Sequence, residues 1–217
     1  MVAIKIVTKT GKLICEVVAE TTWLLKEVKE MIESETGMRP IEQKLFEERY
    51  AEELSEKERL CVLFPDATEV VFVVQRRAKL QYEWLEKVLE SGIQLKSAPP
   101  EVLADLEVVF PAVQRNWRVL QYAADAIKAN RQVAMCALLQ DARAIEFVHE
   151  SLWSDHTFVL FMVQDDGAHI QRASSELADD LVIAMTAVRS DWHAMQWVSP
   201  RLRGDRTILL AAVEEGG

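Results

Sequence analysis

Residues 155–166 read DHTFVLFMVQDD, and residues 180–191, 25 positions further along the chain, read DLVIAMTAVRSD. Both stretches open on an aspartate, carry apolar residues at the same places and close on a second aspartate. The pattern fits itself at the same spacing from residue 102 to residue 217. A fixed period of this length is typical of repeat proteins, in which one small unit cannot bury its apolar face alone and stacks on its neighbours.

One polar column marks the start of a predicted helix in each unit. The side-chain oxygens of Asp and Asn accept hydrogen bonds from the free N–H groups of a first helical turn. Apolar residues three, four, seven and eight positions later then form one stripe of a helix of about ten residues. We therefore interpret the column as helix N-caps, and its members are Asp105, Asn130, Asp155, Asp180 and Asp205.

A second polar column, eleven residues after the first, predicts another and shorter helix in each unit: Asn116, Asp141, Asp166 and Asp191. Two short helices per unit indicate an α-solenoid of 25-residue repeats. The same register extends back to residue 81, and atypical end units are expected of such arrays. The predicted array covers residues 81–217, with a degenerate unit at 81–101, full units at 102–126, 127–151, 152–176 and 177–201, and a half unit at 202–217.

The last two residues also follow this register. Gly216 and Gly217 occupy the second polar column, so they are predicted to form a turn between two helices and not a tail for conjugation. The last unit is then half finished. We expect either a fragment or an array whose apolar face around Leu209 and Val213 is partly uncovered.

The first part of the chain has a different pattern. Residues 4–6 and 13–17 alternate apolar and polar around a turn, which predicts a hairpin. Thr21 and Thr22 offer N-cap hydroxyls for a helix over residues 22–35, and Gly37 and Pro40 end it. Strands are predicted at residues 43–46 and 69–75.

Three short stretches of this region, in this order, resemble ubiquitin and its relatives: TGK at 10–12, EVKEMI at 27–32 and PIEQKL at 40–45. The resemblance implies a β-grasp ubiquitin-like domain at residues 1–77, followed by a short join at residues 78–80. The fold class expected of the whole chain is thus α+β. The last strand runs on into QRRAK and has no terminal Gly-Gly, so a non-conjugated docking domain is expected.

The resemblance also implies a binding patch. The apolar patch that ubiquitin-like domains use would fall on Phe46 and Val73, with Lys9 where a leucine is usual. Because neighbouring residues of a strand face opposite sides, only one of Leu45 and Phe46 can lie fully in the core. A buried structural role for Phe46 therefore stays open.

The second helix of each unit carries a further polar column, flanked by arginines and aromatic residues. Tyr, Trp and Arg dominate the energetics of protein interfaces, so the column is a candidate partner-binding face. The alternative is that the repeats reproduce solvated ancestral side chains. The candidates are Arg118, Gln121, Tyr122, Arg143, Glu146, Gln171, Arg172, Gln196 and Trp197.

Catalysis is not indicated. Asp155–His156 and Asp191 with His193 place a carboxylate near an imidazole, but both aspartates are assigned as caps and no nucleophile accompanies them. Cys15, Cys61 and Cys136 contain no CxxC pair, which argues against a zinc site or a disulfide framework. No cofactor or metal is expected.

The composition of the chain argues against some classes of binding partner. The 217 residues have a net charge of −10, so nucleic acid and anionic membranes are poor partners. The apolar runs are shorter than the ~20 residues that cross a bilayer, and no secretory signal is visible. We expect an intracellular, cytoplasmic adaptor that binds proteins of the ubiquitin-proteasome system. The alternatives are an enzyme of that system, with Cys136 or Cys61 as nucleophile, and a structural spacer.

Overall fold

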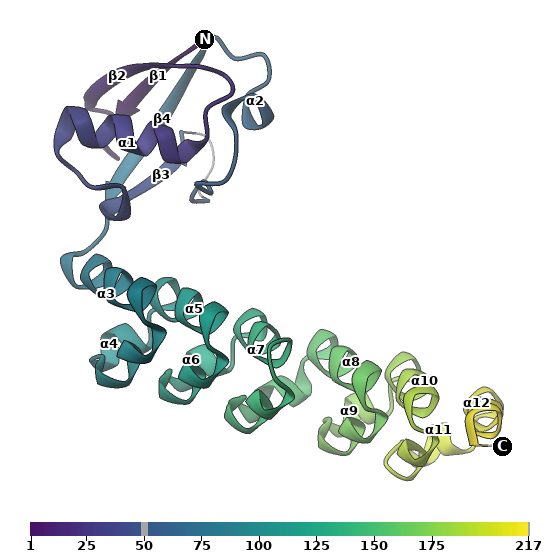
Figure 1. The fold of residues 1–217 in the computed structure, drawn as a ribbon. Coiled ribbons are helices and arrows are strands. Elements are labelled where there is room, and N and C mark those ends of the chain that lie inside the picture. Colours follow the sequence, from purple (N-terminus) through teal and green to yellow (C-terminus); the bar gives the residue numbers. More distant parts are fainter. Residues whose placement is uncertain (49–51, 217) are drawn as a thin grey trace. The chain divides into compact units, whose positions relative to one another are not determined.

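The computed structural model describes residues 1–48 and 52–216 and divides the chain into two compact units, Met1–Glu90 and Ser91–Gly217. The first unit contains a mixed four-stranded sheet and the second is built of helices. The predicted α+β fold class, a sheet domain followed by a helical repeat region, is confirmed (Figure 1).

The sheet is formed by β1 (Val2–Val7), β2 (Leu13–Ala19), β3 (Gln43–Glu47) and β4 (Glu69–Arg76), in the order β2-β1-β4-β3. The central strands β1 and β4 are parallel, and each edge strand pairs antiparallel with its neighbour. The residues of β1 and β4 that alternate inward pack against α1 (Leu25–Thr36), so one face of the sheet forms the core of this unit. The short helices η1 (Pro40–Glu42) and α2 (Leu60–Leu63) complete it.

The start of α1 differs from the prediction. Its N-cap is Leu24, so the expectation that Thr21 or Thr22 caps a helix from residue 22 is wrong. The free backbone N–H of Leu24 donates instead to the Glu27 carboxylate at 2.7 Å. A glutamate in the first turn therefore replaces a capping hydroxyl. The predicted end is confirmed, since Gly37 has a φ of 73°.

Ion pairs hold the chain as it leaves β4. Arg76 pairs with Glu42 at 2.6 Å, and Arg77 pairs with Glu53 at 2.6 Å. The chain then enters α3 (Lys79–Glu90), whose Glu86 pairs with Arg39. The sequence register assigns residues 81–90 to the array, whereas these contacts group α3 with the sheet in the first unit.

Each repeat of the second unit begins with a regular α-helix that follows a residue of the first polar column. Asp105, Asn130, Asp155, Asp180 and Asp205 all accept hydrogen bonds from backbone N–H groups of the helix that follows. These helices are α5 (Leu106–Arg115), α7 (Arg131–Leu138), α8 (His156–Asp165), α10 (Leu181–Ser190) and α12 (Arg206–Gly216).

The second helix of each repeat is shorter than the first, as predicted, and it is a 3₁₀-helix. The residues of the second polar column, from Asn116 to Asp191, cap it through their side chains. In the degenerate unit the N-cap residue is Ser91, whose side chain makes no capping hydrogen bond. The 3₁₀-helices are η2 (Gly92–Ser97), η3 (Trp117–Tyr122), η4 (Ala142–Phe147), η6 (Gly167–Arg172) and η7 (Trp192–Gln196).

A third short helix, absent from the prediction, connects each 3₁₀-helix to the next repeat. One backbone hydrogen bond joins each of these helices to the following one, and its donors recur every 25 residues: Ala124, His149, Ser174 and Ser199. The ladder explains how such short helices persist, because each has a partner in the neighbouring repeat. They are α4 (Pro100–Leu103), α6 (Asp125–Lys128), η5 (Glu150–Ser154), α9 (Ser175–Ala178) and α11 (Pro200–Arg203).

Helix α12 shows two features of the last repeat. It continues to Gly216, so the predicted turn at that glycine is wrong, and Gly217 lies outside the described residues. Ile208 is fully buried, whereas Leu209 and Val213 are 45% and 69% exposed. Leu209 and Val213 are thus exposed on α12, although most of the equivalent residues on the preceding long helices are buried.

Candidate functional site

The acidic residues that neighbour histidines serve mainly as caps. Asp191 accepts both the backbone N–H and a ring hydrogen bond of His193, and these contacts lower the pKa of the Asp191 carboxyl. His156 does not face the adjacent Asp155 and lies 3.8 Å from Asp180, the cap of the next long helix. Neither arrangement contains a nucleophile: the first is a helix cap, and the second is a contact between neighbouring repeats.

The predicted polar column lies on the exposed surface of the 3₁₀-helices. Gln121, Glu146, Gln171 and Gln196 are all exposed. The side chains of Gln121 and Gln196 donate to carbonyls of their own helices, those of Arg118 and His193. Two of the amides are thus held by their own helices, and the role of the column in binding stays a prediction.

The arginines beside this column stack on indole rings. Arg118 and Arg143 lie 4.9 and 5.7 Å from the ring of Trp117, whose other neighbour is Phe147. Tyr122, Phe147 and Trp197 are half-buried. Most of the aromatic surface in this column is therefore covered within the chain itself.

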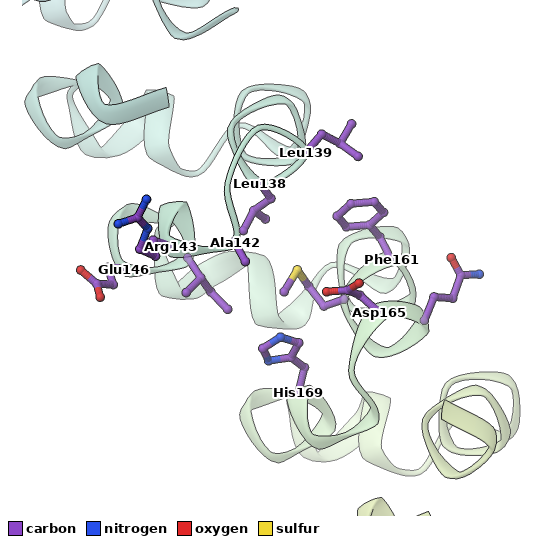
Figure 2. A pocket seen from close by; sticks show the side chains of 11 residues that line it. Leu138, Leu139, Ala142, Arg143, Glu146, Phe161, Asp165 and His169 are labelled. Atoms are coloured by element: carbon purple, nitrogen blue, oxygen red, sulfur yellow. The ribbon is translucent and has the colours of Figure 1, made fainter. Parts of the chain in front are cut away.

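One pocket, of about 710 Å³, opens between the repeats that contain α7 and α8. Figure 2 shows Leu138 and Ala142 on one side, and Phe161, Asp165 and His169 on the other. Of the predicted partner-binding residues, the structure brings only Arg143 and Glu146 to this pocket. Its full lining is Leu138, Leu139, Ala142, Arg143, Ile145, Glu146, Phe161, Met162, Gln164, Asp165 and His169.

The pocket exists because this junction is packed less closely than its neighbours. Helix η6 packs along α10 and η2 packs along α5, whereas η4 makes little contact with α8. A Cβ added at Gly167 of η6 would lie 2.1 Å from the Ala187 carbonyl oxygen of α10. The equivalent residue of η4 is Ala142, which has a Cβ and lines the pocket.

The long helix at this junction is also short. Helix α7 ends at Leu138, whereas α5, α8 and α10 continue to Arg115, Asp165 and Ser190, the positions equivalent to Gln140. The side chain of Gln140 instead donates from Nε2 to the Val113 carbonyl of α5, and its Oε1 accepts from the backbone N–H of Trp117. Leu139 is left 73% exposed at the rim of the pocket.

The charges around the pocket are unevenly compensated. Arg143 binds Asp141 through its guanidinium and its backbone N–H, which lowers the pKa of the Asp141 carboxyl to about 2. Glu146 and Asp165 have no ion-pair partner among the residues that the structure describes. Burial lowers the pKa of His169, which favours its neutral form. The rim is therefore acidic over an apolar floor.

The second predicted patch lies on the sheet, on the face opposite α1. Phe46 and Val73 are register partners in β3 and β4, and Val73 also pairs with Val7 of β1. All three are half-buried, whereas Leu45 is fully buried in the core. The sheet thus brings Phe46 and Val73 together, and Lys9 is exposed in the turn after β1.

The cysteines and the remaining ligand types form no centre within the described residues. Cys136 Sγ lies 3.9 Å from the Gln140 amide, and none of the three thiols is bonded to a histidine there. Burial raises the pKa of the Cys15 thiol. No group of three or more metal-ligating side chains occurs in residues 1–48 and 52–216. The helices in the same ranges include none that could cross a membrane.

Sequence reasoning missed the apolar floor of the pocket. Leu138 and Ile145 stand in columns that are buried elsewhere, so the repeat register predicts core positions for both. The available signals were Leu139, an apolar residue where the other full repeats have Gln114, Gln164 and Arg189, and Ala142, a small residue in a column that holds glycine at residues 92 and 167 and tryptophan at residues 117 and 192.

Comparison with known proteins identifies the repeats. A family described as "Domain of unknown function (DUF4116)" matches residues 105–153, 130–178 and 155–203. These matches begin at Asp105, Asn130 and Asp155, so they advance by the predicted period. No curated protein is significantly similar to the chain.

One solved structure is similar over 99% of both chains, at 12% identity and a TM-score of 0.35, and is described as "Crystal structure of ATBAG1 in complex with HSP70". At that score the similarity supports no conclusion about this chain. Residues 105–203 are thus similar to tandem copies of this family, and they are preceded by a domain that contains a four-stranded sheet.

Proposed function

We propose that this chain is a non-catalytic protein-binding adaptor whose repeat region captures a segment of a partner in the pocket between α7 and α8. The observation that carries the proposal is the pocket itself, with its apolar floor of Leu138, Ile145, Phe161 and Met162. Binding pockets typically measure about 300–1,000 Å³ and combine apolar walls with a few polar groups, and this pocket does the same.

The acidic rim suggests the chemistry of the partner. Arg143 is paired with Asp141, whereas Glu146 and Asp165 form no ion pair among the described residues. Opposite charges on the two sides of an interface speed association and set the register of the complex. The partner segment should therefore carry a large apolar anchor, such as Leu, Phe or Met, flanked by Lys or Arg.

The sheet domain would supply a second docking surface. Its resemblance to ubiquitin-like domains supports this role, and so does the row of Val7, Val73 and Phe46 on the face opposite α1. The ion pairs of Arg76 and Arg77 support a non-conjugated domain, because they tie down the segment that conjugation would need free. A link to the ubiquitin-proteasome system is part of this proposal.

A peptide-display selection against the full chain tests the pocket. We expect enriched peptides with one apolar anchor and flanking basic residues. Replacing Leu139 with Gln should weaken their binding at least about tenfold, since it puts an uncharged polar group in the apolar wall without changing the charge of the rim. The matched control is Val182→Gln on α10, which is similarly exposed and lies outside the pocket. Equal losses in the two variants, or no enrichment, would contradict the proposal.

The absence of catalysis is tested separately with a ubiquitin-derived electrophilic probe. We expect Cys61 and Cys136 to remain unlabelled while a known cysteine protease in the same mixture reacts. Covalent labelling of either cysteine, abolished by its replacement with serine, would overturn the non-catalytic assignment.

A further inference from the structure

A second cavity, of about 560 Å³, lies where η5 meets η6 and the start of α9. It is separate from the pocket between α7 and α8, and the proposed adaptor function does not use it. Most of its polar lining groups can donate hydrogen bonds. The lining residues are His149, Glu150, Ser151, Trp153, Ser154, Arg172 and Ser174.

Arg172 provides a positive charge that no ion pair holds among the described residues. Its guanidinium carbon lies 4.3 Å from the centre of the Trp153 ring, and no carboxylate pairs with it among the described residues. Stacking on an indole fixes the plane of a guanidinium and leaves its N–H groups available at the edge. The side chain is therefore arranged to bind an acceptor with two or more oxygens.

His149 adds a second donor. The backbone N–H of Ser151 donates to His149 Nδ1 at 3.2 Å, and the Ser151 hydroxyl lies 2.8 Å from the same nitrogen. Since Nδ1 acts as the acceptor, the neutral ring carries its proton on Nε2. That N–H has no partner within the described part of the chain. The Ser154 hydroxyl likewise has no described partner.

Trp153 contributes the observation that points most directly to a missing acceptor. Its side chain is 4% exposed, and the indole Nε1–H makes no hydrogen bond to any described residue. Buried polar groups almost always have a partner, and this unpaired donor belongs to a side chain that lines the cavity, so it is available to an acceptor that the described residues do not supply. Because Nε1 is covered, the ligand must shift nearby side chains to reach it.

We propose that this cavity binds an oxyanion, a phosphoryl or carboxylate group carried by a larger molecule. Arg172 supplies the charge, and His149, Ser154 and Trp153 donate hydrogen bonds to the remaining oxygens. Glu150, which also lines the cavity, opposes the anion and sets an upper limit on its affinity. Removing the charge of Arg172 should therefore weaken anion binding, and removing the charge of Glu150 should strengthen it.

The experiment follows the Trp153 indole N–H resonance of the full chain while inorganic phosphate, phenyl phosphate or acetate is added. A saturable shift with the phosphates alone identifies a phosphoryl ligand, and a shift with acetate identifies a carboxylate. Arg172→Gln should weaken binding by about tenfold or more, as expected for a lost hydrogen bond to a charged group. Glu150→Gln should strengthen it.

The matched control is Arg118→Gln, since Arg118 also stacks on an indole, that of Trp117, but does not line the cavity. Its affinity should equal that of the wild type. The proposal is overturned if none of the three anions gives a saturable shift. Equal binding by the wild type and Arg172→Gln, in a variant whose spectrum shows it folded, overturns it as well.

Discussion

Two junctions of the same array, built from equivalent residues, are packed to different degrees. At the junction of η6 with α10, Gly167 allows close approach and Ile170 is 1% exposed. At the junction of η4 with α8, Ala142 and Ile145 line an open pocket. Two local differences mark the open junction: alanine stands at residue 142 where the closed junction has Gly167, and helix α7 ends early.

The comparison shows how a repeat protein can acquire a site without losing its fold. Each repeat contacts only its neighbours, so the stability of the array is close to a sum over junctions. One junction can open while the others remain closed. The pocket between α7 and α8 interrupts the apolar columns locally, and the core continues through Val148, Leu152 and Phe158.

The largest effect should come from truncating the two equivalent isoleucines, one at each junction. Ile170→Ala should destabilise the chain by about 2–5 kcal/mol, because it leaves a cavity in a closed core. Ile145→Ala should cost only about 1–2 kcal/mol, since the pocket already exposes part of that side chain. Urea titrations of both variants and the wild type give the free energies of unfolding that are to be compared. Equal losses would mean that the pocket is closed in solution.

A smaller effect is expected from exchanging the residues at the start of the two 3₁₀-helices. Gly167→Ala forces a Cβ against the Ala187 carbonyl and should cost about 1–3 kcal/mol through displaced backbone. The reverse change, Ala142→Gly, removes no close contact and should cost less than about 1 kcal/mol. Thermal unfolding of both variants compares them. A neutral Gly167→Ala would show that the closed junction does not depend on that approach.

The smallest effect concerns pH. Burial lowers the pKa of His169 from its ordinary 6.5, and Arg172 acts in the same direction, while Asp165 and Asp166 oppose it. The unfolded chain then binds the proton more readily, so the contribution of His169 is complete above pH 6.5 and is lost as the pH falls towards the folded pKa.

The test measures the urea midpoint of the wild type and of His169→Gln between pH 8 and pH 5. The wild type should lose more stability than the variant over this range. Parallel curves for the two proteins would show that His169 is as easily protonated in the folded chain as in the unfolded one.

Local interactions made much of the repeat architecture predictable. A cap such as Asp180 bonds to N–H groups two and three residues away, and this geometry is encoded in the neighbouring residues themselves. The short third helices were missed because the interactions that support them are not local. His149 is an unusual cap, and the ladder that supports these helices joins residues 21 positions apart, such as His149 and Lys128.

The candidate sites were much less predictable. The regular column of Gln121, Glu146, Gln171 and Gln196 suggested a continuous binding face, but repetition records the shared structure of the units and not their differences. The pocket combines floor residues that follow the pattern, such as Leu138 and Ile145, with rim residues that break it, such as Leu139. Only Arg143 and Glu146 belonged to both the predicted face and the observed pocket.

The sequence by itself determined the period, the helix starts and the apolar columns, because caps and helical stripes depend on residues a few positions apart. Only the tertiary structure decided which junctions close. That outcome depends on contacts between a 3₁₀-helix and a long helix about 20 residues further along the chain, such as the approach of Gly167 to the Ala187 carbonyl. Because these contacts join residues far apart in the sequence, no local pattern predicts which junction stays open.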